Sequence, residues 1–186
     1  HGLLTEDRMY FNHDSVITTV DKNTGVMQTL VQEEDYDLLP MAVSGDMLLV
    51  RAKRTRGTER FELRGIDRFT GKTLWIWGMN TAEPIDPPDE MSGLVDDEDA
   101  GWTWRLTGND LQVLTFRAEP HRLIVQHINL DDGSLVSETS IMLKGISGDF
   151  YSIPIVIGWE GDTFYFLVDG MIYSVDVAEG EVRFHY

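Results

Sequence analysis

The sequence predicts an all-β fold, a β-propeller made of four-stranded antiparallel blades, of which four are present. Two turn signals recur four times each and in phase with one another. No segment between them shows a helical apolar stripe with capping residues. Four-stranded units of about 45 residues are typical of propeller blades. An antiparallel sandwich or barrel is the alternative, but its turns need not recur in a fixed phase.

The first signal reads apolar-Asp-x-x-x-Gly and lies between two β-rich runs. Its four glycines are 46, 62 and 47 residues apart. An Asp or Asn at a strand end can accept hydrogen bonds from its own turn, and the Gly four residues later can take a positive φ. We therefore predict a structural role in the blade turns for Asp21, Gly25, Asp67, Gly71, Asn129, Gly133, Asp176 and Gly180.

The second signal lies upstream of each motif and precedes a further strand. One more apolar stretch comes before each copy, so every period holds a four-stranded meander. The four copies are Glu6-Asp7-Arg8, Gly45-Asp46-Met47, Gly108-Asn109-Asp110 and Glu160-Gly161-Asp162.

These repeats predict a single propeller domain over residues 1–186. Four blades allow a small closed ring, a ring completed by a homodimer, or part of a longer chain; we favour a fragment that dimerises. The expected segments are blade 1 at about 2–32, blade 2 at about 37–78, an acidic insertion at about 79–100, blade 3 at about 101–143 and blade 4 at about 151–186.

Composition excludes several classes of partner and chemistry. The net charge of −17 and the pI near 4.4 disfavour nucleic acid and anionic membrane surfaces. The absence of cysteine excludes disulfides, thiolate metal sites and thiol nucleophiles. No apolar run approaches ~18 residues, so we expect no membrane insertion. The first residues do not show the pattern of a signal peptide.

Charge is distributed unevenly between blades 2 and 3. Eight of the fifteen Lys and Arg residues lie between Arg51 and Lys72. Arg54, Arg56 and Arg60 are candidates for binding an anionic partner, and protection of an exposed strand edge is the alternative. The acidic, Pro-containing segment 79–100 supplies candidate metal ligands, or it is a solvated insertion. These ligands are Asp96, Asp97 and Asp99, although the spacing of a calcium-binding EF-hand loop is absent.

No catalytic or cofactor-binding residue is expected. The sequence has no nucleophile elbow, phosphate-binding glycine loop or metal-binding pair of histidines at helical spacing. Two tryptophan pairs, Trp75 with Trp77 and Trp102 with Trp104, alternate along predicted strands. We expect them to pack between blades; binding of a glycan or a planar cofactor is the alternative.

The segment from Ile66 to Trp75 resembles the repeat of the PQQ-like (quinoprotein alcohol dehydrogenase-like) propellers, apolar-Asp-x-x-Thr-Gly-Lys-x-x-Trp. The resemblance implies that Trp75 docks against the adjacent blade. The copy from Val20 to Gly25 lacks the Trp, and blades 3 and 4 keep only the turn.

The resemblance has two functional implications. Some members of the family are dehydrogenases that bind pyrroloquinoline quinone and calcium within a ring of about eight blades. They place a vicinal cysteine pair against the cofactor, which this chain lacks. Other members are non-catalytic, such as the propeller lipoprotein of bacterial outer-membrane assembly, and bind protein partners through loops and blade edges. We expect a non-enzymatic scaffold without a cofactor, and the resemblance favours an extracytoplasmic or periplasmic location.

Overall fold

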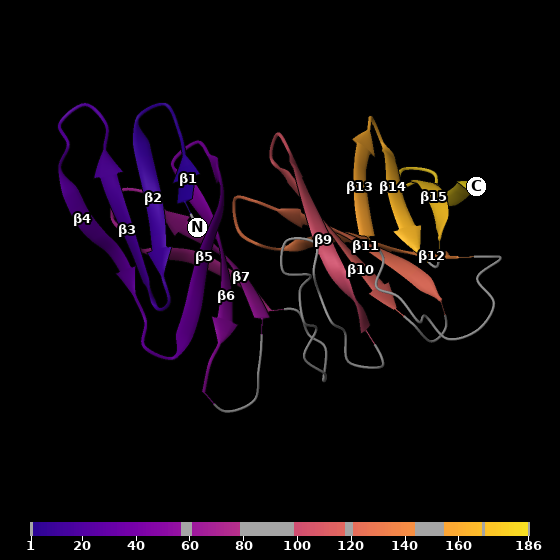
Figure 1. Cartoon of the computed structure of the whole chain (residues 1–186), viewed down its shortest axis with the longest axis horizontal. Helices are drawn as coiled ribbons and strands as arrows, with labels where there is room; N and C mark the ends of the chain where they lie inside the picture. Colours follow the sequence, from indigo (N-terminus) through magenta and orange to yellow (C-terminus); the bar gives the residue numbers. More distant parts are fainter. Residues whose placement is uncertain are drawn as a thin grey trace. The chain divides into compact units, whose positions relative to one another are not determined.

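The computed structural model describes residues 2–56, 61–78, 99–117, 121–143, 155–168 and 170–185. Within these residues all regular structure is β-strand, arranged as four separate sheets of four antiparallel strands each. Strand order in every sheet follows the chain, so each sheet is a meander. No helix long and apolar enough to cross a membrane occurs in the described part of the chain. The predicted all-β architecture of four blades is confirmed (Figure 1).

The first two blades lie in one compact unit, which also includes the turn Leu130–Ser134. Short Gly- and Asp-containing turns join the strands, which favours antiparallel neighbours. Blade 1 consists of β1 (Gly2–Leu4), β2 (Arg8–His13), β3 (Val16–Asp21) and β4 (Met27–Gln32). Blade 2 consists of β5 (Tyr36–Ser44), β6 (Met47–Arg54), β7 (Phe61–Asp67) and β8 (Thr73–Gly78).

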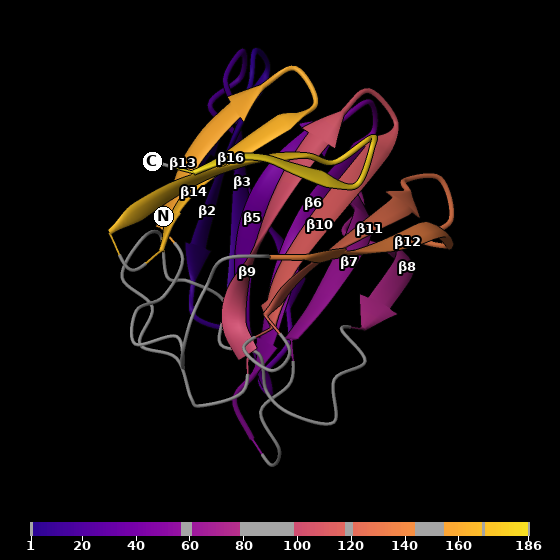
Figure 2. The ribbon, with the colours of Figure 1, turned by 90° about the vertical axis from the view of Figure 1, so that its right-hand side faces the viewer.

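Blades 3 and 4 form most of the second compact unit (Figure 2). The strand β9 begins at Asp99, inside the segment that the sequence assigned to the acidic insertion. Blade 3 consists of β9 (Asp99–Thr107), β10 (Asp110–Arg117), β11 (Arg122–Asn129) and β12 (Leu135–Met142). Blade 4 consists of β13 (Ile155–Glu160), β14 (Thr163–Val168), β15 (Met171–Asp176) and β16 (Glu181–His185).

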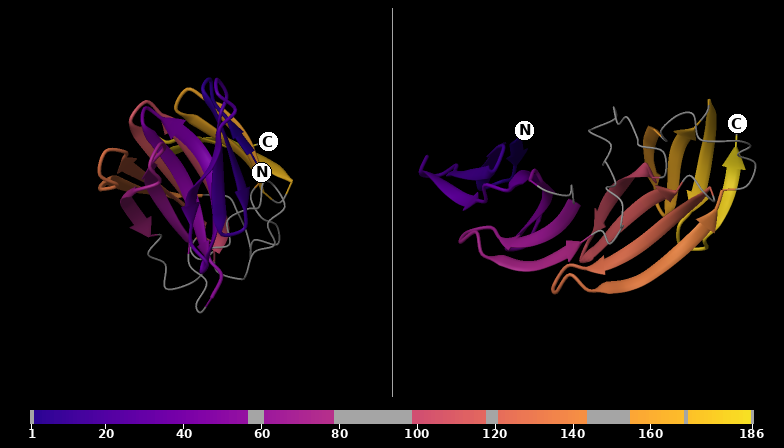
Figure 3. Two further views of the ribbon diagram at one scale, coloured as in Figure 1. Left: turned by 90° about the vertical axis from the view of Figure 1, so that its left-hand side faces the viewer. Right: turned by 90° about the horizontal axis from the view of Figure 1, so that it is seen from below.

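The core of the first unit lies between the sheets of blades 1 and 2. Alternate side chains of a strand point to the same face, so one face of each blade can supply a continuous apolar layer. Figure 3 shows the twisted strands of these blades from two further directions. The cluster contains Tyr10, Ile17, Leu30 and Val31 from blade 1 and Leu38, Leu48, Val50, Ala52 and Ile66 from blade 2.

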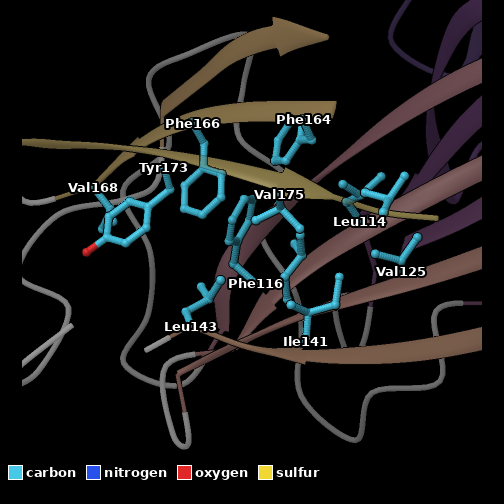
Figure 4. Close-up of a cluster of buried hydrophobic side chains, with 12 residues drawn as sticks. Leu114, Phe116, Val125, Ile141, Leu143, Phe164, Phe166, Val168, Tyr173 and Val175 are labelled. Carbon is cyan, nitrogen blue, oxygen red and sulfur yellow. The ribbon is translucent and has the colours of Figure 1, made fainter. Parts of the chain in front are cut away.

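The core of the second unit is aromatic and lies between the sheets of blades 3 and 4. The alternation of strand β14 explains how the sequence forms this core, because the buried Phe164, Phe166 and Val168 alternate with less buried residues. The Phe116 and Phe166 rings meet edge to face with centroids 5.0 Å apart, and Phe166 stacks on Tyr173 at 5.3 Å. Figure 4 shows these rings directed into one cluster with Leu143 and Ile141. Such aromatic pairs add to the energy of apolar burial.

Candidate functional site

The motif turns are the repeated feature of the sequence, and blade 2 shows their geometry most fully. Asp67 Oδ1 accepts hydrogen bonds from the backbone N–H of Phe69 (3.0 Å) and Thr70 (2.8 Å) and from Thr70 Oγ1 (2.9 Å). Gly71 N donates to the Asp67 carbonyl at 2.9 Å, with φ of 73°. The carboxylate therefore holds the turn, and the glycine supplies the left-handed conformation that closes it.

Blades 1 and 4 repeat this arrangement. Asp21 Oδ1 accepts hydrogen bonds from the backbone N–H groups of Asn23 and Thr24, at 2.9 Å each. Asp176 Oδ1 accepts in the same way from Ala178 and Glu179, at 3.0 and 2.9 Å. Gly25 and Gly180 both have φ of 70°. The motif residues of these two blades therefore have the same local geometry as those of blade 2.

Blade 3 has a carboxylate at the position that Thr24 and Thr70 occupy in blades 1 and 2. Asn129 ends β11 at the motif position, while Asp132 Oδ1 accepts a hydrogen bond from Ser134 N at 2.9 Å. Gly133 keeps the positive φ, at 70°. The bond from Ser134 N matches those from Val26 N to Thr24 and from Lys72 N to Thr70, so blade 3 keeps this part of the turn.

Three motif glycines lie against the fourth strand of the preceding blade. A Cβ on Gly71 would meet the Leu30 carbonyl oxygen of β4 at 1.9 Å, and one on Gly133 would meet the Trp75 ring of β8 at 2.7 Å. A Cβ on Gly180 would touch Thr139 of β12 at 3.5 Å. A Cβ on Gly25 would meet no other part of the chain within 4 Å. The turns of blades 2, 3 and 4 are therefore contact points, whereas that of blade 1 is open.

Trp75 links its own strand to the turn of blade 3. The side chain is 6% exposed, and its Nε1–H donates to the Leu130 carbonyl at 2.6 Å. Gly65, opposite Trp75 on β7, has no side chain to obstruct the indole, since a Cβ there would lie 2.4 Å from it. Trp77 and Trp104 are half-buried, and Trp102 is buried. Trp75 is thus committed to a structural contact.

A cation–π and ion-pair cluster joins the turns of blades 1 and 2. The Arg68 guanidinium pairs with the Asp7 carboxylate, and Arg8 lies 3.7 Å from the carboxylate of Asp21. Both guanidinium carbons lie over the Phe69 ring, at 4.8 Å for Arg68 and 5.1 Å for Arg8. These charges serve a contact within the first unit.

A second cluster surrounds Arg64 of β7. Its guanidinium bonds to Glu33 Oε2 at 2.7 Å and to Glu62 Oε2 at 2.9 Å, and it lies 4.3 Å above the Tyr36 ring. The side chains of Arg64 and Glu62 are only 4% and 7% exposed. Burial disfavours the charged Arg64, but the two carboxylates outweigh it and raise its pKa. Arg64 therefore ties β7 to the segment between β4 and β5.

A third cluster lies in the second unit and centres on Arg105 of β9. Arg105 Nε donates to Gln112 Oε1 at 3.1 Å, and its guanidinium lies 3.9 Å over Trp159 and 3.3 Å from Asp162. The network continues from Gln112 to Asp110, whose carboxylate contacts His127 Nδ1 at 2.9 Å. No local sequence signal indicates this cluster, because its members are spread over blades 3 and 4.

The predicted charged sites have mixed outcomes. Arg54 and Arg56 are exposed at the end of β6, and Arg56 lies 3.4 Å from the Asp35 carboxylate. Arg60, Asp96 and Asp97 lie outside the described residues, and of Asp99 only the backbone is described. In the described part of the chain no group of three or more acids or histidines could hold a metal ion. Partner binding at Arg54, Arg56 and Arg60 stays a prediction.

No protein-family model and no curated protein matches the sequence. Solved structures are similar to it in fold. BamB from Moraxella catarrhalis has a TM-score of 0.52 at 16% identity, covering 96% of this chain and 49% of BamB. Quinohemoprotein alcohol dehydrogenase ADHIIG from Pseudomonas putida HK5 has a TM-score of 0.58 at 15% identity, covering 100% of this chain and 34% of the dehydrogenase. A europium-containing methanol dehydrogenase has a TM-score of 0.58 at 14% identity, covering 100% and 40%.

The chain has a β-propeller fold of four-stranded blades. At identities of 16% and below, the likeness shows the fold and nothing finer. The chain spans about half of BamB and between 34% and 40% of the two dehydrogenases. The activities and partners of those whole proteins therefore enter only as proposals for this chain.

Proposed function

We propose that this chain is a non-enzymatic propeller scaffold that binds a protein partner through its loops and blade edges. The observation that supports this is the surface of the fourth strands, which are edge strands of their sheets. Edge strands present unpaired backbone groups, and a partner strand can bind there by extending the sheet. Apolar side chains are exposed at three of these edges: Val26 and Met27, Leu74 and Ile76, and Leu135 and Val136.

Strand β8 is the best-defined of these edges. Leu74 is 50% and Ile76 54% exposed, and they flank the buried Trp75, which fixes the strand in place. A rigid edge lowers the conformational cost of binding an extended peptide. The partner chemistry that fits this edge is an extended segment with alternating apolar side chains.

A library of extended peptides tests this proposal directly. We expect selected apolar peptides to bind the chain and Ile76→Asp to abolish that binding. Phe11→Asp is the matched control, because Phe11 is also exposed but lies in the inner strand β2. If peptides bind the Ile76→Asp variant as well as the unaltered chain, or if no peptide binds, the blade edge is not the site.

The rival function is a piece of a dehydrogenase that uses pyrroloquinoline quinone and calcium. The structural likeness to the quinohemoprotein alcohol dehydrogenase motivates it. Titration with the quinone and calcium separates the two functions through the fluorescence of the five tryptophans. The scaffold proposal predicts no saturable quenching, and saturable quenching would favour the rival. A glycan array tests a third function, glycan binding through the paired tryptophans. The scaffold proposal predicts that no glycan binds.

A further inference from the structure

Three buried polar atoms of the first unit make no hydrogen bond within the described part of the chain. They are the hydroxyl oxygens of Tyr10 and Thr19 and the Nε atom of Arg68. Tyr10 and Thr19 are 0% exposed, and Arg68 is 9% exposed. A buried polar group without a hydrogen bond is unfavourable, so each of these atoms requires a partner.

The register of blade 1 places two of these atoms on adjacent side chains. Tyr10 of β2 pairs directly with Thr19 of β3, so both side chains point to the same face of the sheet. Blade 2 covers that face, because Tyr10 belongs to the buried cluster that includes Leu38 and Ile66. The two hydroxyls therefore lie in the contact between the blades, away from bulk solvent.

Arg68 enters the same contact from blade 2. It follows β7, its backbone N–H donates to the Asp46 carbonyl at 2.9 Å, and a terminal nitrogen of its guanidinium pairs with Asp7. Burial raises the pKa of Tyr10, and the nearby charges of Arg68 and Arg8 oppose that rise. The Tyr10 hydroxyl therefore lies close to the Arg68 guanidinium, whose Nε–H makes no hydrogen bond in the described chain.

The charges around the three atoms balance, which decides the kind of molecule that can bind there. The two guanidinium groups of Arg8 and Arg68 lie beside the two carboxylates of Asp7 and Asp21. Both guanidinium carbons also lie over the Phe69 ring. An added ion would leave a net charge in a desolvated site, so a neutral molecule fits better than an anion.

The hydrogen-bonding capacity of the three atoms defines that molecule further. The Nε–H of an arginine can only donate, so its partner must supply an acceptor, whereas each hydroxyl can both donate and accept. Water can donate and accept at once, and it is small enough for a closely packed contact. Buried waters typically make about three hydrogen bonds to groups that would otherwise be unsatisfied.

We propose that one ordered water molecule is bound between blades 1 and 2, where it accepts a hydrogen bond from Arg68 Nε and bonds to the hydroxyls of Tyr10 and Thr19. The water joins the turn of blade 2 to the sheet of blade 1, in addition to the ion pair of Arg68 with Asp7. All of these residues belong to one compact unit. The inference goes beyond the proposed edge-binding function and does not depend on it.

A high-resolution crystal structure of the unaltered chain tests the site directly. We expect solvent density about 2.7–3.2 Å from Arg68 Nε and from both hydroxyl oxygens. Magnetic relaxation dispersion of water oxygen-17 counts long-lived internal waters independently. The double variant Tyr10→Phe with Thr19→Val should hold one fewer such water than the unaltered chain. The control Thr18→Val, whose half-buried side chain points to the opposite face, should hold the same number. No density at the three atoms, or an unchanged count in the double variant, would overturn the bound water.

Urea unfolding distinguishes a hydrated site from a dry one by the sign of the change in stability. Tyr10→Phe and Thr19→Val each remove one hydroxyl with little change of shape. With the water bound, each variant should lower the folding equilibrium constant about five-fold, the size of one lost hydrogen bond. The double variant should lose less than the product of the two, because both changes act on the same water. Variants that are more stable than the unaltered chain would show dry, unbonded hydroxyls and contradict the proposal. A loss that depends on chloride concentration at constant ionic strength would replace the water with an anion.

Discussion

Asp67 and Asp21 hold their turns through charge as well as through geometry. Hydrogen bonds from the Thr70 backbone and side chain lower the pKa of Asp67, and one from the Thr24 backbone lowers that of Asp21. In blade 3 the hydrogen bonds of Ser134 lower the pKa of Asp132 instead. Each carboxylate is favoured in its ionised form by donors that exist only in the folded chain.

A pH series should detect this contribution. A folded-state pKa below the ordinary value of 3.8 stabilises the fold above that value, and the stabilisation is lost as the pH falls through the lowered pKa. The free energy of unfolding of the unaltered chain should therefore decrease below about pH 5. Asp67→Asn keeps an acceptor oxygen without the charge, so its decrease should be shallower. Urea unfolding at each pH measures both proteins. If their free energies of unfolding fall equally with pH, a role for this charge is contradicted.

Trp75 contributes through one buried hydrogen bond in addition to its ring. Trp75→Phe keeps an aromatic ring but leaves the Leu130 carbonyl without its donor, which should cost about 1–3 kcal/mol of unfolding free energy. Trp77→Phe is the control on the same strand, where the half-buried side chain should lose less than about 1 kcal/mol. Urea unfolding measures both, and equal losses would argue against the Trp75 contact.

At the scale of the strands, β7 is tied to the segment between β4 and β5 by Arg64. Its partner Glu33 precedes the first strand of blade 2, and its partner Glu62 lies in β7 itself. The cluster therefore fixes where blade 2 begins. A buried ion pair is costly to break because the remaining charge stays desolvated. The cluster therefore opposes displacement of β5 from β7 more than it adds to total stability.

Removing one or both charges should separate these effects. Arg64→Leu should lose about 3–5 kcal/mol, because the buried Glu62 carboxylate keeps its charge but loses the guanidinium that compensates it. Arg64→Leu with Glu62→Leu should recover most of that loss, since apolar side chains of similar volume suit the buried site. Chemical denaturation of both variants checks this, and a double variant less stable than the single one would refute it.

Local spacing in the sequence was sufficient to predict the strands and their meander order. A motif such as Asp67 to Gly71 is a turn within six residues, so its signal does not depend on distant parts of the chain. The clusters around Arg64 and Arg105 could not be predicted, because their partners lie 31 and 57 residues away and charge alone does not set pairing. Arg64 and Arg68 belong to the basic stretch between Arg51 and Lys72, yet both are buried in ion pairs.

For the molecule as a whole, the repeated contact is that of a motif turn on the preceding blade. Repeat proteins are stabilised by the sum of each unit and its contacts with neighbours. The motif glycines of blades 2 and 3 therefore have two roles: they allow a positive φ, and they leave space for the neighbouring strand. Gly45 and Gly108 have similar φ values of 56° and 61° but no neighbour within 4 Å, so they have only the first role.

The most direct test of this central claim is urea unfolding of four glycine-to-alanine variants. Gly45→Ala and Gly108→Ala should each lose about 1 kcal/mol of unfolding free energy, the cost of a left-handed conformation for a non-glycine residue. Gly71→Ala and Gly133→Ala should lose about 1–3 kcal/mol more, because the new methyl group would clash with Leu30 or Trp75. Losses of equal size at all four positions would show that the motif turns do not pack against the preceding blade.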